Sequence, residues 1–208
     1  MVIRAVLFDF HGVLTESPWG AIAAAGGDND HADVLSLMMG DYGADTDHAW
    51  HRLERGEISL HDYVEDLIAR ADDAGVEIDF QKLQSFNDHL QVRAAVVDRI
   101  RQLKAAGYRT AVITNNVREL GSHWRSLVDL DPLFDAVVDS CEVGMRKPNP
   151  AIYLHALDQL GGVPPAEAVF LDDHPANVAG ARGAGLHGIF VEEPGEALRE
   201  LDALLAAG

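Results

Sequence analysis

The segment AVLFDFHGVLT, residues 5–15, decides how the rest of this chain is interpreted. Its short apolar run ends abruptly at a carboxylate, Asp9, and a turn containing Gly12 follows. An apolar run of this length, bounded by a polar residue and a glycine, is typical of a buried parallel strand. The C-terminal ends of such strands form the edge of an α/β sheet where these folds bind ligands. The sequence therefore predicts that Asp9 lies at a functional site.

The bulk composition restricts the classes of function. The 208 residues are enough for one good-sized domain, or for a core domain with a smaller insertion. The net charge of −18 argues against binding nucleic acid through a basic face, and it requires any anion site to be locally positive. A single cysteine, Cys141, suits a reducing compartment. We recognise neither a signal peptide nor a membrane-spanning stretch, and we expect a cytoplasmic protein.

Residues 17–91 differ in composition from the rest of the chain. They are rich in histidine, acidic and helix-forming residues, and Ser59 with Asp62 resembles a capping box. His48 and His51 are one helical turn apart and could bind a metal, but without a third ligand nearby we interpret them as a solvated helix face. We predict a helical insertion that packs over the strand ends as a cap. Apolar positions recur at helical spacing over 45–51, 59–71 and 80–90.

From residue 92 onward, predicted helices and strands alternate along the chain. This alternation predicts βαβ units and a parallel sheet between two helical layers. The expected fold is α/β: a Rossmann-like three-layer core, residues 1–16 and 92–208, with an inserted helical cap, residues 17–91. The predicted strands are 108–113, 136–138, 168–171 and 188–191, and the helices are 96–106, 149–160, 178–184 and 196–206.

Polar side chains follow several of these strands. Asp9 ends the first strand, Thr114-Asn115 follows the second, and Asp172-Asp173 follows the fourth. Lys147 precedes a helix and can reach the same place. Because the C-terminal ends of parallel strands lie along one edge, we expect these groups to converge. Oxygen ligands without thiolates or a histidine pair select a hard divalent ion such as Mg²⁺.

Together these segments resemble the four sequence motifs of the haloacid dehalogenase superfamily, in the right order. The motifs are residues 9–15, Thr114-Asn115, Lys147-Pro148, and Leu171-Asp172-Asp173 with Asn177. Residues 143–148 and 171–177 are most similar to the N-terminal phosphatase-like domain of soluble epoxide hydrolases, and residues 55–59 resemble the helical cap of that subgroup.

The resemblance implies a nucleophile and a metal site. Asp9 matches the nucleophile that attacks phosphorus and forms an aspartyl-phosphate. The second oxygen of Asp9 and the backbone carbonyl of His11 match metal ligands. Asp173 matches a direct ligand of Mg²⁺, and Asp172 one that acts through water.

The resemblance also implies a phosphate site. Thr114 and Asn115 match residues that hold the phosphate, and Lys147 matches the cation that pairs with both phosphate and nucleophile. Gly12 and Asn177 match supporting residues of the two loops. This set is chemically coherent, because phosphoryl transfer depends on positioning and charge neutralisation, which a metal and a lysine supply.

The position of His11 departs from the family pattern. Phosphatases of the family usually carry a second aspartate there, which protonates the leaving oxygen and later deprotonates water. Imidazole is a competent general acid or base near neutral pH, but its ring is larger than a carboxylate and its reach differs. Two alternatives remain open: His11 performs the proton transfers, or the site is crippled or repurposed. A positioned general acid is worth about 10²–10⁴ in rate.

We therefore expect a magnesium-dependent hydrolase of a small phosphorylated molecule, which needs neither nucleic acid nor a membrane and acts as a monomer or homodimer. A non-catalytic binding or regulatory protein that keeps the phosphate and metal site is a second alternative. Cleavage of a phosphonate or a carbon–halogen bond is a third, although dehalogenases lack an acidic pair like Asp172-Asp173. The sequence does not identify the substrate, because specificity lies in the cap loops.

Overall fold

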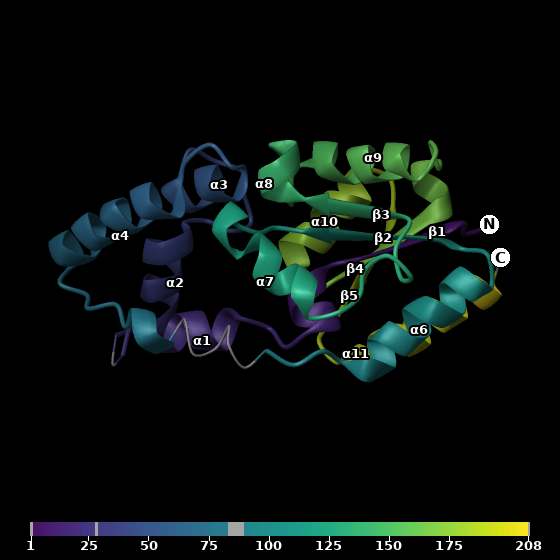
Figure 1. Cartoon of the computed structure of the whole chain (residues 1–208), viewed down its shortest axis with the longest axis horizontal. Coiled ribbons are helices and arrows are strands. Elements are labelled where there is room, and N and C mark those ends of the chain that lie inside the picture. Colours follow the sequence, from purple (N-terminus) through teal and green to yellow (C-terminus); the bar gives the residue numbers. More distant parts are fainter. Residues whose placement is uncertain (1, 28, 83–89, 208) are drawn as a thin grey trace.

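The computed structural model describes residues 2–27, 29–82 and 90–207. A parallel sheet with helices on both faces forms one end of the elongated molecule, and helices α1 to α4 form the other (Figure 1). We call residues 17–91 the cap and the remainder the core. Among the described helices, none combines the length and the apolar character that crossing a bilayer requires.

The core sheet has five parallel strands in the order β3-β2-β1-β4-β5. The central strand β1 is completely buried, and Phe8 at its end pairs with Val112 on one side and Leu171 on the other. This register aligns the ends of β1, β2 and β4 at one edge, as the α/β prediction requires. The strands are β1 (Ala5–Phe8), β2 (Arg109–Thr114), β3 (Ala136–Asp139), β4 (Ala168–Asp172) and β5 (His187–Phe190).

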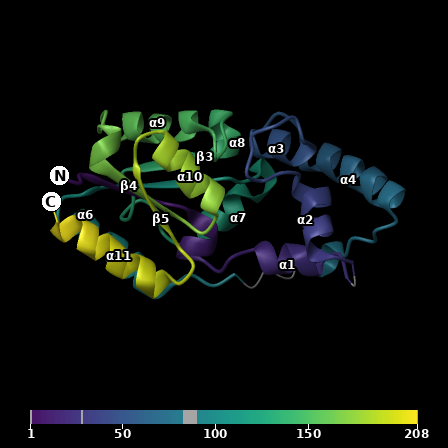
Figure 2. The same cartoon turned by 180° about the vertical axis from the view of Figure 1, so that it is seen from behind.

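Helices cover both faces of the sheet, because successive side chains of a strand point to opposite faces. Val6 and Phe8 of β1 pack in one apolar cluster with α6, α7 and α11. Ala5 and Leu7 pack in a second cluster with α9 and α10, and the two layers are visible from behind in Figure 2. The core helices are α6 (Ala94–Ala105), α7 (Gly121–Ser126), α8 (Ser140–Val143), α9 (Pro150–Gln159), α10 (Pro175–Gly183) and α11 (Pro194–Ala206), with short 3₁₀ turns at Arg118–Leu120 and Pro165–Glu167.

The cap helices pack in a third apolar cluster, which includes Val34, Met38 and Leu67 together with Val117 of the core. The capping box is present: the side chains and backbone amides of Ser59 and Asp62 bond reciprocally at the start of α4. Sequence patterning did not detect α1 or α2, and most of the helix predicted over 80–90 lies outside the described residues. The cap helices are α1 (Trp19–Ala24), α2 (His31–Met39), α3 (Ala49–Glu54) and α4 (Leu60–Ala74).

Two predictions in the cap are wrong. We expected a helix over residues 45–51, but residues 40–48 form no helix. Helix α3 begins at Ala49, because the His48 side chain is its N-cap and accepts a hydrogen bond from the Trp50 amide on Nδ1. His51 is not on a solvated face; it is fully buried, and its Nδ1 accepts a hydrogen bond from the Thr46 amide at 3.0 Å. Burial lowers the pKa of His51 to about 4, so the ring is neutral and holds the preceding loop in place.

The chain passes between core and cap at two neighbouring points. Thr15 and Val92 form an isolated antiparallel bridge, and the Arg93 amide donates to the carbonyl of Leu14 at 2.7 Å. The Arg93 guanidinium also donates to the carbonyls of Gly12 and Val13. The turn that follows Asp9 is therefore held by the residue at which the chain re-enters the core.

Candidate active site

Asp9 lies immediately after β1, where the chain turns into a short helical segment, Phe10–Leu14. Its Oδ1 accepts hydrogen bonds from the Phe10 amide and from Nζ of Lys147, both at 2.7 Å. The side chain is 10% exposed, so one carboxylate oxygen is fixed from two directions while the group still faces a cavity.

Gly12 makes this turn possible. Its φ is +86°, and a Cβ at this position would lie 2.0 Å from Oδ2 of Asp173. A side chain is excluded both by the backbone conformation and by the neighbouring carboxylate. The glycine therefore lets the turn after β1 lie directly on the acidic residues that follow β4.

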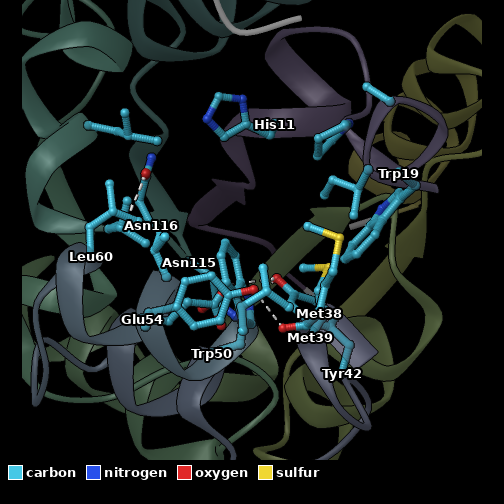
Figure 3. Close-up of a pocket in the computed structure, with 18 of the residues that line it drawn as sticks. His11, Trp19, Met38, Met39, Tyr42, Trp50, Glu54, Leu60, Asn115 and Asn116 are labelled. Atoms are coloured by element: carbon cyan, nitrogen blue, oxygen red, sulfur yellow. Dashed lines mark hydrogen bonds between the residues drawn. The ribbon is translucent and has the colours of Figure 1, made fainter. Parts of the chain in front are cut away.

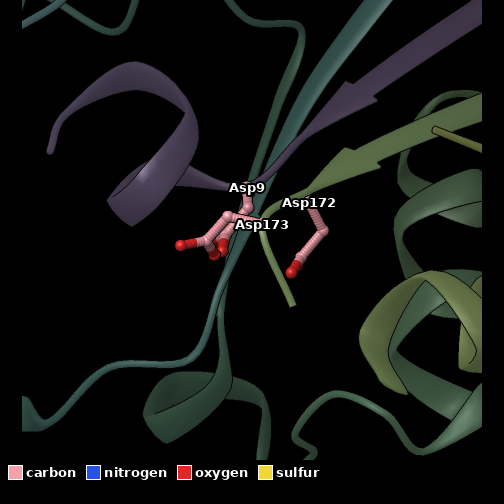
Figure 4. A group of neighbouring side chains, drawn as sticks. All are labelled: Asp9, Asp172 and Asp173. Atoms are coloured by element: carbon pink, nitrogen blue, oxygen red, sulfur yellow. The ribbon is translucent and has the colours of Figure 1, made fainter. Parts of the chain in front are cut away.

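Asp9, Asp172 and Asp173 form an acidic cluster in which one oxygen of each lies within 4.8 Å of the others (Figure 4). Asp172 is completely buried and accepts hydrogen bonds from Nζ of Lys147 at 2.7 Å and from Nδ2 of Asn177 at 3.0 and 3.1 Å. Asp173 accepts one from Ser17 at 2.7 Å. Asp172 is thus held by protein donors, whereas Asp173 is the more accessible of the pair.

The charges in this cluster are not balanced by Lys147 alone. Burial raises the pKa of Asp9 well above its usual value, and Asp172 and Asp173 raise it further although Lys147 opposes them. Burial and the charge of Asp172 raise the pKa of Asp173 to about 6. The donor set consists of carboxylate oxygens, and it carries excess negative charge that a hard divalent cation would neutralise. These residues therefore fit Mg²⁺, with Asp9 and Asp173 placed to hold it.

Lys147 is clamped by Asn115. The Lys147 amide donates to Oδ1 of Asn115 at 2.8 Å, and Nδ2 of Asn115 donates to the Lys147 carbonyl at 3.0 Å. Burial would lower the pKa of Lys147, but Asp172 and Asp9 raise it above its ordinary value, so the amine is an ammonium. The Asn115 side chain thus holds this loop in place, and its predicted contact with a phosphate stays a prediction.

Two donors at the same edge have no hydrogen-bond partner among the described residues. They are the hydroxyl of Thr114 and Nδ2 of Asn116, and both residues are buried. Buried donors are normally satisfied, so these two can donate to an acceptor on a ligand or to a water molecule. Thr114 was expected from the sequence to hold phosphate, whereas Asn116 was not among the predicted site residues.

His11 lies at the same end of the cavity as Asp9. Its Nδ1 is 3.2 Å from the Thr15 hydroxyl, and its ring meets the Phe10 ring edge-on. Burial, together with the charges of Lys147 and His123, lowers the pKa of His11 to about 4, so the imidazole is neutral at pH 7. The predicted role of its backbone carbonyl as a metal ligand stays a prediction.

A cavity of about 560 Å³ separates the sheet edge from the cap. The residues that line it include His11, Asn115 and Asn116 from the core and Trp19, Met38, Met39 and Trp50 from the cap, as Figure 3 shows. The apolar wall consists of Pro18, Trp19, Ala21, Ile22, Met38, Met39, Trp50, Leu60, Val64, Leu67, Phe80, Val117 and Leu120, with Tyr42 and Tyr63.

Several residues of the site have no local signal in the sequence. Ser17 reaches Asp173 across 156 positions of the chain. Glu54 of α3 forms a buried ion pair with Arg146, and Tyr42 contacts Asn115. Only Arg146 could have been suspected, because it lies beside Lys147 within the Met145-Arg146-Lys147-Pro148 segment.

A family model described as haloacid dehalogenase-like hydrolase matches residues 3–185. Acyl-CoA dehydrogenase family member 10 of Mus musculus is 33% identical over 207 residues, which is 97% of this chain and 19% of that protein. Bifunctional epoxide hydrolase 2 of Sus scrofa is 32% identical over 224 residues, which is 97% of this chain and 39% of that protein. The chain thus spans about a fifth and two fifths of these two relatives.

A third relative matches over nearly its whole length. Sesquiterpene phosphatase astK of Aspergillus oryzae is 28% identical over 210 residues, 97% of this chain and 96% of that protein.

Solved structures share the fold. A predicted HAD-like family hydrolase from Porphyromonas gingivalis superposes with a TM-score of 0.65 at 26% identity, covering 97% of this chain and 98% of the other. A dehalogenase with an intermediate complex gives a TM-score of 0.67 at 24% identity, over 98% and 97% of the two chains. The fold, the order of the motifs and the family match lead to one conclusion: this chain belongs to the haloacid dehalogenase-like hydrolases.

Proposed function

We propose that this protein is a magnesium-dependent phosphomonoesterase whose substrates carry a phosphate on an apolar organic group. The observation that carries the proposal is the continuity of one cavity, which has Asp9, Asp173 and Asn115 at one end and an apolar wall at the other. A phosphate at the sheet edge would place the organic part of the substrate against that wall. The name of the sesquiterpene phosphatase relative supports the same substrate class.

In the proposed phosphoryl transfer, residues of this chain bind the phosphate and supply the nucleophile. Lys147 and the free hydroxyl of Thr114 would bind non-bridging oxygens of the phosphate. Both hydrogen bonds to Asp9 end on Oδ1, so we assign the attack on phosphorus to Oδ2. The new O–P bond forms as the ester O–P bond breaks, and the leaving alcohol oxygen takes its proton from solvent water. Water then attacks the aspartyl-phosphate, releasing phosphate and restoring the Asp9 carboxylate.

Mg²⁺ bound by Asp9 and Asp173 would supply charge neutralisation of the phosphate oxygens. His11 is assigned the role of general base that takes a proton from the attacking water, because its imidazole is neutral at pH 7 and lines the cavity with Asp9. His11→Ala should then reduce kcat by about 10²–10⁴ for alkyl and aryl phosphates alike, because both pass through the same aspartyl-phosphate. Undiminished turnover of both esters would remove His11 from this role.

The test of the proposal is a series of straight-chain alkyl phosphates of increasing length, assayed with and without Mg²⁺. Burial of each methylene contributes about 0.8 kcal/mol, so kcat/KM should rise roughly fourfold per carbon until the cavity is filled. Asp9→Asn should abolish turnover of every member of the series. Activity that is independent of chain length would contradict the apolar substrate class, and full activity of Asp9→Asn would contradict the nucleophile.

The binding or regulatory alternative rests on one observation, the histidine at the acid/base position. It predicts Mg²⁺-dependent binding of inorganic phosphate, measured by calorimetry, with no turnover of any ester. Cleavage of a phosphonate or of a carbon–halogen bond would be recognised by release of the carbon product or of halide from the corresponding compounds.

A further inference from the structure

Arg146 belongs to the core, yet its side-chain partners belong to the cap. Nε donates to Oε2 of Glu54 at 2.7 Å, Nη1 donates to the Ala44 carbonyl, and Cζ lies 4.9 Å from the centre of the Tyr42 ring. The side chains of Arg146 and Glu54 are 0% and 2% exposed. Because a buried ion pair often contributes little net stability, its value is more readily sought in the geometry that it imposes.

Lys147 follows Arg146 in the same loop, but its side chain contacts the acidic cluster of the core. Lys147 extends its ammonium to Asp9 and Asp172, at 2.7 Å from an oxygen of each. Adjacent residues of one loop thus bind the cap and the acidic cluster. A shift of the backbone at Arg146 would move the ammonium of Lys147 as well.

Asn115 provides a second connection between Lys147 and the cap. Asn115 bonds both the amide and the carbonyl of Lys147, and its Nδ2 also lies 3.3 Å from the Tyr42 hydroxyl. That hydroxyl in turn donates to Oε1 of Glu54 at 3.4 Å. The contacts close into a ring that joins two cap residues to three core residues: Tyr42, Glu54, Arg146, Lys147 and Asn115.

We infer that Glu54 and Tyr42 are positioning residues of the cap, which hold Lys147 between Asp9 and Asp172 through this ring. The cap would therefore complete the active site as well as enclose the substrate. The hydroxyl of Tyr42 makes its hydrogen bonds in this ring of contacts, whereas its aromatic face packs against Arg146. The two contributions can be separated, because Tyr42→Phe removes the hydroxyl and keeps the aromatic side chain.

The first experiment uses Tyr42→Phe with steady-state kinetics, and this readout rests on the proposed function. Small displacements of a catalytic group can cost about 10²-fold. We expect kcat for an alkyl phosphate to fall about tenfold while KM and Tm stay close to the wild-type values. The matched control is Arg55→Gln, which removes two ion pairs within the cap, one with Asp45 and one with Glu57, and should leave kcat unchanged. An unchanged kcat in Tyr42→Phe would overturn the role of Tyr42.

The second experiment does not depend on turnover. The Lys147 ammonium is shielded from water and should give a slowly exchanging ¹⁵N–¹H signal in the full-length protein. Replacing the pair by Glu54→Met with Arg146→Met removes both buried charges together, so the protein should stay folded. We expect the exchange of the Lys147 signal to accelerate by about tenfold or more in this double variant, and also to accelerate in Tyr42→Phe.

Together the two experiments distinguish a failure of the proposed function from a failure of the positioning role. Wild-type protein that hydrolyses no phosphate ester would contradict the proposed function, and the Lys147 signal would still decide the inference. Unchanged exchange in Tyr42→Phe and in the double variant would overturn the inference, even in an active phosphatase. If the double variant does not fold, Tyr42→Phe alone decides.

Discussion

The two ends of the cavity differ in how their side chains are held. At the sheet edge, Lys147, Asp172 and Asn115 each make several hydrogen bonds to groups from other parts of the chain. At the cap end, Met38, Met39 and their neighbours are held by apolar contacts. Directional bonds fix positions, whereas unbranched apolar side chains adapt to the shape of what they contact. The comparison teaches that the polar groups at the sheet edge are fixed in position, while the apolar side chains of the cap can adapt to the group that they contact.

The largest effect should follow from removing the cation of the rigid end. Lys147→Met leaves Asp9 and Asp172 without their shared ammonium. We expect kcat to fall by about 10³ or more, because electrostatic stabilisation of this kind is a large part of catalysis. The free energy of unfolding should also fall by about 3 kcal/mol, since a buried carboxylate pair loses its partner. Kinetics and urea denaturation measure both, with Lys104→Met, a partly exposed core lysine, as control. Retained activity would contradict a rigid catalytic end.

A smaller effect should follow from crowding the contact between the two acidic loops. Gly12→Ala combines a positive φ with the clash against Asp173, whereas Gly107→Ala has a similar φ, +91°, with nothing within 4 Å. Both substitutions cost about 1–2 kcal/mol of backbone strain. Only Gly12→Ala should also weaken Mg²⁺ binding, by about tenfold or more, as measured by calorimetry. Equal affinities in the two variants would show that the turn does not position Asp173.

The adaptable end can be probed by filling it. Ala21→Phe places a ring in the cavity wall, and Ala24→Phe places one on the exposed side of the same helix. If the ring displaces three methylene groups of the substrate, kcat/KM for a long alkyl phosphate falls by about 2.4 kcal/mol, or roughly 60-fold. Short esters should be unaffected, and so should every ester with Ala24→Phe. A loss shared by short and long esters would mean that Ala21 influences the rigid end.

The smallest effect concerns the accessibility of the core beside the site. Cys141 of α8 is buried, and burial, with Asp139, raises the pKa of its thiol to about 12. At pH 8 the thiol therefore stays protonated in the folded protein and should react with iodoacetamide far more slowly than in urea, where a free thiol has a pKa of about 8.5. Equal rates in both states would show that this part of the core opens readily.

The sequence was most informative where function coincides with strand ends. The apolar runs before Asp9 and Asp172 identify buried strands, and parallel topology then brings their carboxylates together without further information. The same reasoning failed for His51, because helical spacing alone does not distinguish a buried face from a solvated one. It also could not pair Glu54 with Arg146, which are 92 positions apart and belong to different parts of the chain. Contacts of this kind depend on how the cap seats on the core, and no local pattern encodes that.

The paired crossing at Thr15 and Val92 has a consequence for how such an enzyme can diverge. Because the segment between them departs and returns at adjacent points, its length and composition can change while the strands outside it keep their register. New substrate preferences could then arise by remodelling or exchanging one contiguous stretch of the gene. The ring through Arg146 sets a condition on that freedom: a replacement must bring its own acceptor for the buried guanidinium.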